Sequence, residues 1–409
     1  MRTCIPERCG VIALDPFSPF AILVLVTLAV VSAAVLTKIF GPPPLQGRFA
    51  TIDGLRGYLA FFVFVHHSAV WYQYLHGGEW ALPPSLLYTH LGKSGVSVFF
   101  MITGFLFYLK ILDGARRPID WTRLYVSRIL RLTPLYLFAM LCLFIIVLIL
   151  SDGVRRTTLS DVLLQIFRWL TFTISGARDI NGIEQTFIIV AGVTWSLRFE
   201  WFFYMSLPLL ALTAGIRPPR TYLLVSIAAA VGTALILAPA MRVLLLPFLS
   251  GIATARLTKH PGFCSFAKGP AATILVVLCT TSCVTFFAEP EKPLPLVLIS
   301  LSFALIACGN TLLGALTHAY SRTLGELAYS IYLLHGLSLF TAFRFFVGFD
   351  RAQHFSPLQH WLTVGAVTPI LIAVCFATYK LIEAPAMHSV PALTAWLRSF
   401  IRVSPPKSA

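Results

Sequence analysis

Residues 53–67 read DGLRGYLAFFVFVHH, an apolar run that opens with an aspartate and an arginine and closes with two adjacent histidines. With the residues that follow, it is long enough for a transmembrane helix, which needs about 20 predominantly apolar residues. Arg56 and His67 are eleven residues apart, so in an α-helix they lie within about 20° of one face and about 16 Å apart along the axis. His66 points about 100° away. We therefore expect one face of a membrane helix to present a cation near its start and an imidazole deeper in.

The composition of the chain indicates a polytopic membrane protein. Its 409 residues are 57% hydrophobic and only 11% charged, whereas soluble domains carry about 25% charged residues. So few charges exclude a cytosolic enzyme, a disordered tail and a fibrous repeat. We expect an all-α helix bundle in the membrane with eleven spans, at residues 19–40, 55–75, 94–111, 133–151, 196–215, 221–238, 240–256, 270–288, 294–315, 325–346 and 361–384.

The basic residues predict the orientation of the chain. The formal charge is +15, and Lys and Arg accumulate in cytoplasmic loops of membrane proteins. Placing loop 112–132 in the cytoplasm puts most basic connections on that side and predicts a cytoplasmic C-terminus and an outer N-terminus. No basic and aromatic module for nucleic acid is present, so we expect no nucleic-acid partner. The apolar part of the long 152–195 connection, residues 162–172, is too short to cross and predicts a re-entrant or interfacial helix.

The apolar run near the N-terminus is either a membrane helix or a cleaved signal peptide. Residues 19–40 follow two arginines and contain small residues at 32–34, a pattern also found in cleaved signal peptides. The run is long for a signal peptide, so we expect a retained helix.

None of the eight cysteines forms a C-x-x-C pair or a zinc-ligand spacing, and we expect no metal. Cys4 and Cys9 are able to pair only in an oxidising compartment.

Ionisable residues inside membrane spans are costly and usually face the bundle interior or a wet cavity. One interpretation of the first segment is a pocket in which Arg56 holds an anionic group and His67 removes a proton from a hydroxyl. The alternative is an arginine that snorkels to the membrane surface and a histidine bonded to a neighbouring helix. The residues alone do not decide between the two.

A cluster of arginines lies just before the expected span 133–151. Arg128 and Arg131 are three residues apart and share one helix face, and Arg123 precedes them. Guanidinium groups suit phosphates, and coenzyme A carries a pyrophosphate and a 3′-phosphate. The cluster is therefore a candidate site for a ligand that carries phosphates. Ordinary positive-inside charge in contact with lipid headgroups is the alternative interpretation.

Three further polar segments lie in apolar surroundings. Glu200 needs a partner, and either orients a histidine, binds a substrate hydroxyl or forms a structural pair with an arginine. Ser330, Tyr332 and His335 are placed to bond across helices, and Glu383 near the end of the last span is interpreted as packing and end-capping. No Gly-rich phosphate loop, H-E-x-x-H or G-x-S-x-G occurs, so nothing indicates an ATPase, a metalloprotease or a serine hydrolase.

In this order, the segments resemble the membrane-bound acyltransferase family 3, which includes O-antigen and peptidoglycan O-acetyltransferases. The resemblance covers about residues 48–388, and the joint order and spacing of individually weak motifs makes it specific. Ser97 and Thr103 depart from the Asp and Ser common in relatives. The matching pieces are 53–57 with His67, 95–105 (GVSVFFMITGF), 128–136 (RILRLTPLY), 194–204 (TWSLRFEWFFY), 329–335 (YSIYLLH) and 383–385 (EAP).

The resemblance implies a ten-helix acyltransferase domain at residues 48–388. Residues 1–47 then carry one extra N-terminal membrane helix, and residues 389–409 form a cytoplasmic tail. It also implies transfer of an acyl group, by family habit acetyl, from cytoplasmic acyl-CoA to a hydroxyl of a glycan or glycolipid, in a bacterial inner membrane. Acyl-CoA is then a donor substrate, and no bound cofactor is expected.

The family's motifs fall on particular residues of this chain. Its arginine and histidine motif falls on Arg56 and His67, and its Arg-x-x-Arg on Arg128 and Arg131. We expect His67, Arg56 and Glu200 to be catalytic. We expect the acyl-CoA to contact Arg128, Arg131 and Arg123. Supporting or acceptor-binding roles are expected for Asp53, Tyr136, Ser330, Tyr332 and His335.

Two other classes of protein fit a chain of this composition. A lipid or glycan transporter would show an inverted repeat and paired broken helices, and the sequence indicates neither. A non-catalytic scaffold would have no need to keep the arginines and the histidine together. We therefore expect an enzyme.

Overall fold

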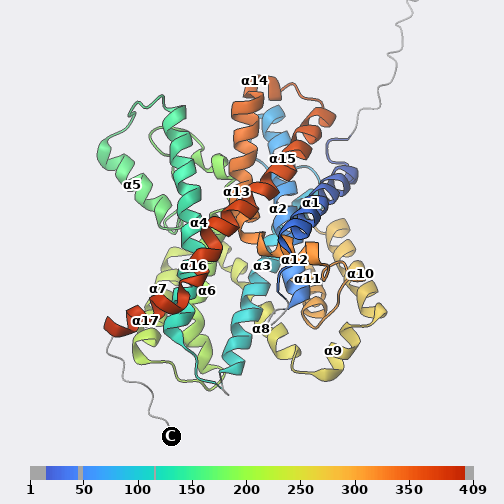
Figure 1. Cartoon of the computed structure of the whole chain (residues 1–409), viewed down its shortest axis with the longest axis vertical. Coiled ribbons are helices and arrows are strands. Elements are labelled where there is room, and N and C mark those ends of the chain that lie inside the picture. The colour runs from blue at the N-terminus through green and yellow to red at the C-terminus, as the bar shows by residue number, and fades with distance from the viewer. Residues whose placement is uncertain (1–14, 45–48, 115–116, 401–409) are drawn as a thin grey trace, which may run out of the picture.

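The computed structural model describes residues 15–44, 49–114 and 117–400, and these ranges contain helices and no strand (Figure 1). Cys4, Cys9 and the end of the tail lie outside them. Short 3-10 segments span Thr186–Val190 and Pro239–Leu245, and π-helical turns span Ala342–Val347 and Tyr379–Glu383. The α-helices are α1 (Pro19–Phe40), α2 (Ala50–Gly77), α3 (Leu86–Asp113), α4 (Trp121–Leu150), α5 (Leu159–Leu170), α6 (Trp195–Leu212), α7 (Arg220–Ile236), α8 (Leu246–Leu257), α9 (Pro261–Ala267), α10 (Pro270–Phe286), α11 (Pro293–Ala307), α12 (Ala319–Glu326), α13 (Ala328–Thr341), α14 (Phe349–Ala352), α15 (Pro357–Thr378), α16 (Ala384–His388) and α17 (Val390–Phe400).

The fold is the expected all-α polytopic membrane bundle. Each of the eleven predicted spans overlaps a helix. By length and hydropathy alone, five helices of the described part are able to cross a membrane, or six if one pair bent by 107° counts as a single span. α2 is not among the five, because polar side chains such as His66 and His67 lower its hydropathy. It packs against α3, α12 and α13 in the interior of the bundle, so protein rather than lipid surrounds most of it.

Glycines let α2 approach its neighbours closely. A Cβ at Gly54 would lie 1.9 Å from the carbonyl oxygen of Leu316, and one at Gly57 would lie 2.6 Å from the backbone nitrogen of Gly325. No side chain fits at these contacts, because real Cβ atoms do not come within 3.0 Å of backbone. The glycines near Arg56 therefore bring this part of α2 against α12 and the segment that precedes it.

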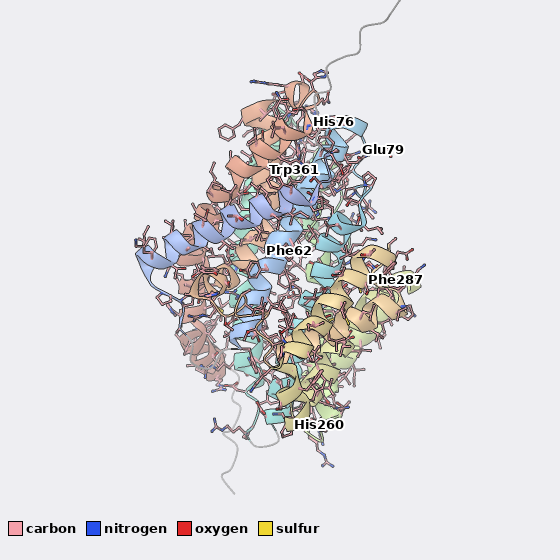
Figure 2. All side chains as sticks on the ribbon, turned by 90° about the vertical axis from the view of Figure 1, so that its right-hand side faces the viewer. Phe62, His76, Glu79, His260, Phe287 and Trp361 are labelled. Carbon is pink, nitrogen blue, oxygen red and sulfur yellow. The ribbon has the colours of Figure 1, made fainter. Side chains whose placement is uncertain are left out.

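The N-terminal helix belongs to the bundle. α1 packs on α15 and α12, and the hydroxyls of Thr37 and Thr323 lie 2.7 Å apart. Figure 1 shows α1 running obliquely across the helices near α2 and α15. In the side view of Figure 2, His76 and Glu79 lie near one end of the long axis and His260 near the other. These are the ends that the basic loops assign to the outer and cytoplasmic sides.

Two short amphipathic helices lie outside the bundle core. α5 falls in the long connection where the sequence predicts a short helix, and it exposes Leu163 and Phe167. α17 was not expected, because the last span predicted from hydropathy ends at residue 384. It packs on α4, and Arg398 forms an ion pair with Asp120, the residue that caps the start of α4, at 2.5 Å.

Candidate active site

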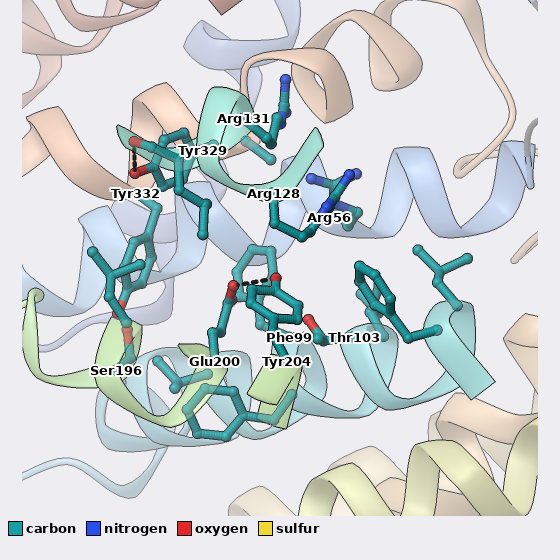
Figure 3. A pocket seen from close by; sticks show the side chains of 18 residues that line it. Arg56, Phe99, Thr103, Arg128, Arg131, Ser196, Glu200, Tyr204, Tyr329 and Tyr332 are labelled. Carbon is teal, nitrogen blue, oxygen red and sulfur yellow. Dashed lines mark hydrogen bonds between the residues drawn. The ribbon is translucent and has the colours of Figure 1, made fainter. Parts of the chain in front are cut away.

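A cavity with a mainly apolar wall and several charged side chains lies between α2, α3, α4, α6 and α13 (Figure 3). It encloses about 780 Å³, including its opening. Arg56, Arg128, Arg131, Glu200 and Tyr332 all line it, so residues far apart in the sequence meet at one place. Its apolar wall includes Val96, Phe99, Phe100, Ile102, Leu106, Phe107, Leu132 and Leu197.

The cavity opens toward the end of α3 and the start of α4. A second hollow of about 1200 Å³ shares the three arginines with the cavity and adds Asp53 and Lys110. It continues into an outer groove through Lys110, and Arg117 and Arg123 line that groove. Adjoining hollows thus lead from the connection between α3 and α4 to Arg56. Lys110, Arg117 and Arg123 are the basic residues that line them on the way.

Each cavity arginine is held differently. The Nη1 atom of Arg131 lies 3.2 Å from the Oε2 atom of Glu383, whose other carboxylate oxygen accepts a hydrogen bond from Ser330. The Arg128 guanidinium lies 5.0 Å from the centre of the Phe107 ring and donates to Ser127. Arg131 is therefore compensated by a carboxylate, whereas Arg128 rests on an aromatic ring.

Arg56 is held less directly. Within residues 15–44, 49–114 and 117–400 its guanidinium forms no ion pair within 4 Å, but the carboxylates of Asp53 and Glu200 stabilise its charge from further away. The side chain is half-buried and lines both the cavity and its opening. A cation at this depth that has no directly paired carboxylate among the described residues favours an anionic ligand, because a buried charge is costly without a close partner.

Glu200 faces the same cavity from α6. Its Oε2 atom accepts a hydrogen bond of 2.7 Å from the Tyr204 hydroxyl, one helical turn later. In the part of the chain that the structure describes, Glu200 forms no ion pair within 4 Å and no hydrogen bond to a histidine. Its carboxylate is therefore held by a tyrosine while it lines a cavity that also holds the three arginines.

Tyr332 of α13 also lines the cavity. Its hydroxyl lies 2.7 Å from the Ser196 hydroxyl and donates to the carbonyl oxygen of Val193 at 3.2 Å. The Tyr332 ring centre lies 6.0 Å from that of Phe99 and 6.2 Å from that of His335. The tyrosine therefore lies near both a wall of the cavity, at Phe99, and His335.

His67 lies next to His335, beyond Tyr332. Its Nδ1 atom is 3.0 Å from the Nε2 atom of His335 and 3.0 Å from the Val63 carbonyl oxygen. The ring stacks on Trp80 with centres 6.3 Å apart, and it is half-buried. His67 does not line the arginine cavity or its opening.

Arg56 and His67 nevertheless face the same helix, as their spacing predicts. The cavity at Arg56 is also lined by Tyr329 and Tyr332 of α13, and His67 contacts His335 of α13. His66 points elsewhere, to the carbonyl oxygen of Tyr88 at 2.8 Å. The shared face is turned into the protein rather than toward lipid.

The other predicted site residues lie around this centre. Asp53 lines the opening and Arg123 the outer groove. Ser330 lies behind Arg131, as its bond to Glu383 shows. Tyr136 is fully buried, donates to the Trp169 carbonyl oxygen at 2.5 Å and does not line the cavity.

Sequence reasoning missed two features of the site. It interpreted Glu383 as packing, whereas the structure pairs this carboxylate with Arg131. It also passed over Lys110, a basic residue at the end of an apolar run that lines both the opening and the outer groove. A basic residue near the end of a span normally indicates only the membrane surface, so the sequence held no signal for this role.

Comparison with known proteins identifies the class of this molecule. The Acyltransferase domain family matches residues 49–380, which confirms the resemblance, and the chain belongs to this family. Its long apolar helices are those of a multi-pass membrane protein. Acyltransferase MdmB of Streptomyces mycarofaciens is 30% identical over 176 residues, which cover 41% of this chain and 40% of that protein. No solved structure matched the chain.

Proposed function

We propose that the protein transfers an acyl group, most simply acetyl, from cytoplasmic acyl-CoA to a hydroxyl of a glycan or glycolipid. The observation that carries this proposal is the meeting of Arg56, Arg128 and Arg131 where the cavity joins its opening. Of these, Arg56 and Arg128 form no ion pair within 4 Å with a carboxylate of the described ranges. Guanidinium groups bind phosphate oxygens in a bidentate manner, and coenzyme A is a phosphate-rich carrier of activated acyl groups.

The shape of the open space supports this donor. The outer groove with Arg117 and Arg123 suits the 3′-phosphate, and the three inner arginines suit the pyrophosphate. The pantetheine arm then enters the cavity along Phe99, and the thioester approaches Tyr332. The opening lies beside the 112–132 loop, which the basic residues assign to the cytoplasm. We therefore place the C-terminus in the cytoplasm and the protein in a bacterial inner membrane.

In the proposed reaction, His67 removes the proton of the acceptor hydroxyl as its oxygen attacks the thioester carbonyl. A general base supplies about 10²–10⁴-fold of the acceleration, and positioning by the arginines supplies more. We place Tyr332 between the cavity and His67, because it lines the cavity and packs on His335, and transfer then requires its ring to turn aside. Donor and acceptor then meet at the level of His67, with the acceptor on the Trp80 side.

Binding of CoA to the purified protein in lipid nanodiscs tests the donor assignment. We expect Arg128→Ala and Arg131→Ala each to raise the dissociation constant about tenfold or more, because each removes charged hydrogen bonds worth about 1.5–3 kcal/mol. Arg242→Ala is the control, since Arg242 is exposed and lines neither the cavity nor its opening. Equal CoA binding by all three variants and the unaltered protein would refute the donor site.

A further inference from the structure

The hydrogen bonds of His67 and His335 determine which of their ring nitrogens carry hydrogen. The Nδ1 atom of His335 lies 2.9 Å from the Ile331 carbonyl oxygen, and the Nδ1 atom of His67 lies 3.0 Å from the Val63 carbonyl oxygen. A carbonyl oxygen only accepts, so both Nδ1 atoms must carry hydrogen. The Nε2 atom of neutral His335 then has a free lone pair.

That lone pair points at His67. The Nε2 atom of His335 lies 3.0 Å from the Nδ1 atom of His67, so the single Nδ1–H of His67 is shared between Val63 and His335. The remaining nitrogen of His67, Nε2, is unprotonated in this neutral form. This Nε2 atom forms no hydrogen bond to a described residue, and it is not one of the fully buried polar atoms that lack a hydrogen-bond partner. The nitrogen needed by a general base is therefore the available one.

We propose that His335 is a positioning residue that holds His67 in the Nδ1–H tautomer and stabilises the imidazolium formed during transfer. This inference rests on the proposed function, because it takes His67 as the base. His335 is 0% exposed, so it touches no substrate and acts through His67. A neutral histidine thus occupies the place that a carboxylate takes in the serine–histidine–aspartate arrangement.

The proton balance of the step is complete. The acceptor hydroxyl gives its proton to Nε2 of His67 as its oxygen bonds to the thioester carbon. The carbon–sulfur bond breaks, and the thiolate takes the proton back from Nε2. While both ring nitrogens of His67 carry hydrogen, the Nδ1–H donates to His335, a charge-assisted bond that is stronger than its neutral counterpart.

The surroundings offer His67 no carboxylate for this task. Phe64 and Tyr332 pack around His335, and His66 and Trp80 pack around His67. Among the residues that the structure describes, neither ring of the pair bonds to Asp or Glu. His335 is thus the one side chain of these ranges that accepts from Nδ1 of His67.

The experiment compares His335→Leu with His335→Gln in full-length protein in nanodiscs. Transfer is measured as label moved from [14C]acetyl-CoA into lipid and glycan of membranes from the native cells. Leucine removes the acceptor, and we expect kcat to fall about 10- to 100-fold, the value of a charged hydrogen bond, with an unchanged KM for acetyl-CoA. Glutamine places an amide oxygen near the position of Nε2 and should restore most of kcat. Ser338→Ala, one turn along α13, controls for packing.

The possible results distinguish the role of His335 from the proposed function. An unchanged kcat in His335→Leu overturns the inference, and so does a glutamine variant that is as impaired as the leucine variant at equal thermal stability. Full transfer by His67→Ala would instead overturn the proposed function. If His67→Ala is inactive while His335→Leu is normal, the base assignment stands and only the role of His335 is lost.

Discussion

Arg131 and Glu383 form an ion pair of 3.2 Å between α4 and the π-helical turn that follows α15. The pair joins an early helix of the chain to a late one at the cavity wall. Glu383 is 1% exposed and Arg131 17% exposed, so water screens the pair only in part. The last motif of the sequence therefore has a defined role, which is to hold an arginine of the proposed donor site.

Replacing Glu383 with glutamine should weaken donor binding. The neutral amide cannot fix the Arg131 guanidinium as a carboxylate does, so we expect the dissociation constant for CoA to rise about tenfold, near the value of one charged hydrogen bond. Glu289→Gln is the matched control, because Glu289 pairs with Lys292 on an exposed connection. Unchanged CoA affinity in a stably folded Glu383→Gln protein would show that the ion pair does not serve the donor site.

Arg123 should matter less than the inner arginines. It lies in the open outer groove, where water and salt screen charges. Arg123→Ala should therefore raise the KM for acetyl-CoA only about threefold, with a difference that shrinks as salt is added. A loss as large as that of Arg128→Ala, and insensitive to salt, would place Arg123 at a desolvated phosphate instead.

The close approach of α2 and α12 should not tolerate a side chain. Gly54→Val would drive its Cβ into the Leu316 backbone, and overpacking of this kind costs about 1–3 kcal/mol. We expect a lower melting temperature and a lower yield of folded protein. Gly232→Val in α7 is the control, since no atom lies within 4 Å of its added Cβ. Equal melting temperatures for the two variants would contradict this packing.

Tyr136 should prove structural. Its hydroxyl donates to the Trp169 carbonyl oxygen and its ring stacks on Phe172, which connects α4 to the segment after α5. Tyr136→Phe should lower the free energy of unfolding by about 1 kcal/mol and leave the KM for acetyl-CoA unchanged. A raised KM without a change in melting temperature would assign the hydroxyl to the substrate.

The sequence predicts the helical architecture well, because apolar runs and the scarcity of charge are properties of composition. It also predicts that Arg56 and His67 share a helix face, since helical geometry is regular. It does not predict that His67 contacts His335 and stays outside the arginine cavity, because that depends on how α13 packs against α2. The number of membrane crossings also stays a prediction, since five or six of the described helices qualify by length and hydropathy.

Other features depend on contacts between distant parts of the chain. His67 has two interpretations, a histidine bonded to a neighbouring helix and a general base. Both fit the same geometry, because the bond to His335 uses Nδ1 and leaves the Nε2 atom of His67 free to accept a proton. Arg128 and Arg131, adjacent on one face, differ in their partners, and no local pattern distinguishes them. α17 follows the last apolar run, and its packing on α4 has no signature in hydropathy.

The most direct test of the account is acyl transfer by His67→Ala beside His66→Ala, with [14C]acetyl-CoA and native membranes. Both variants should bind CoA like the unaltered protein, because neither ring lines the arginine cavity. We predict that His67→Ala loses transfer entirely, whereas His66→Ala, which loses a bond to the Tyr88 backbone and a ring contact with His67, retains much of it. Transfer by His67→Ala at the rate of the unaltered protein would contradict the central claim that this imidazole is the base.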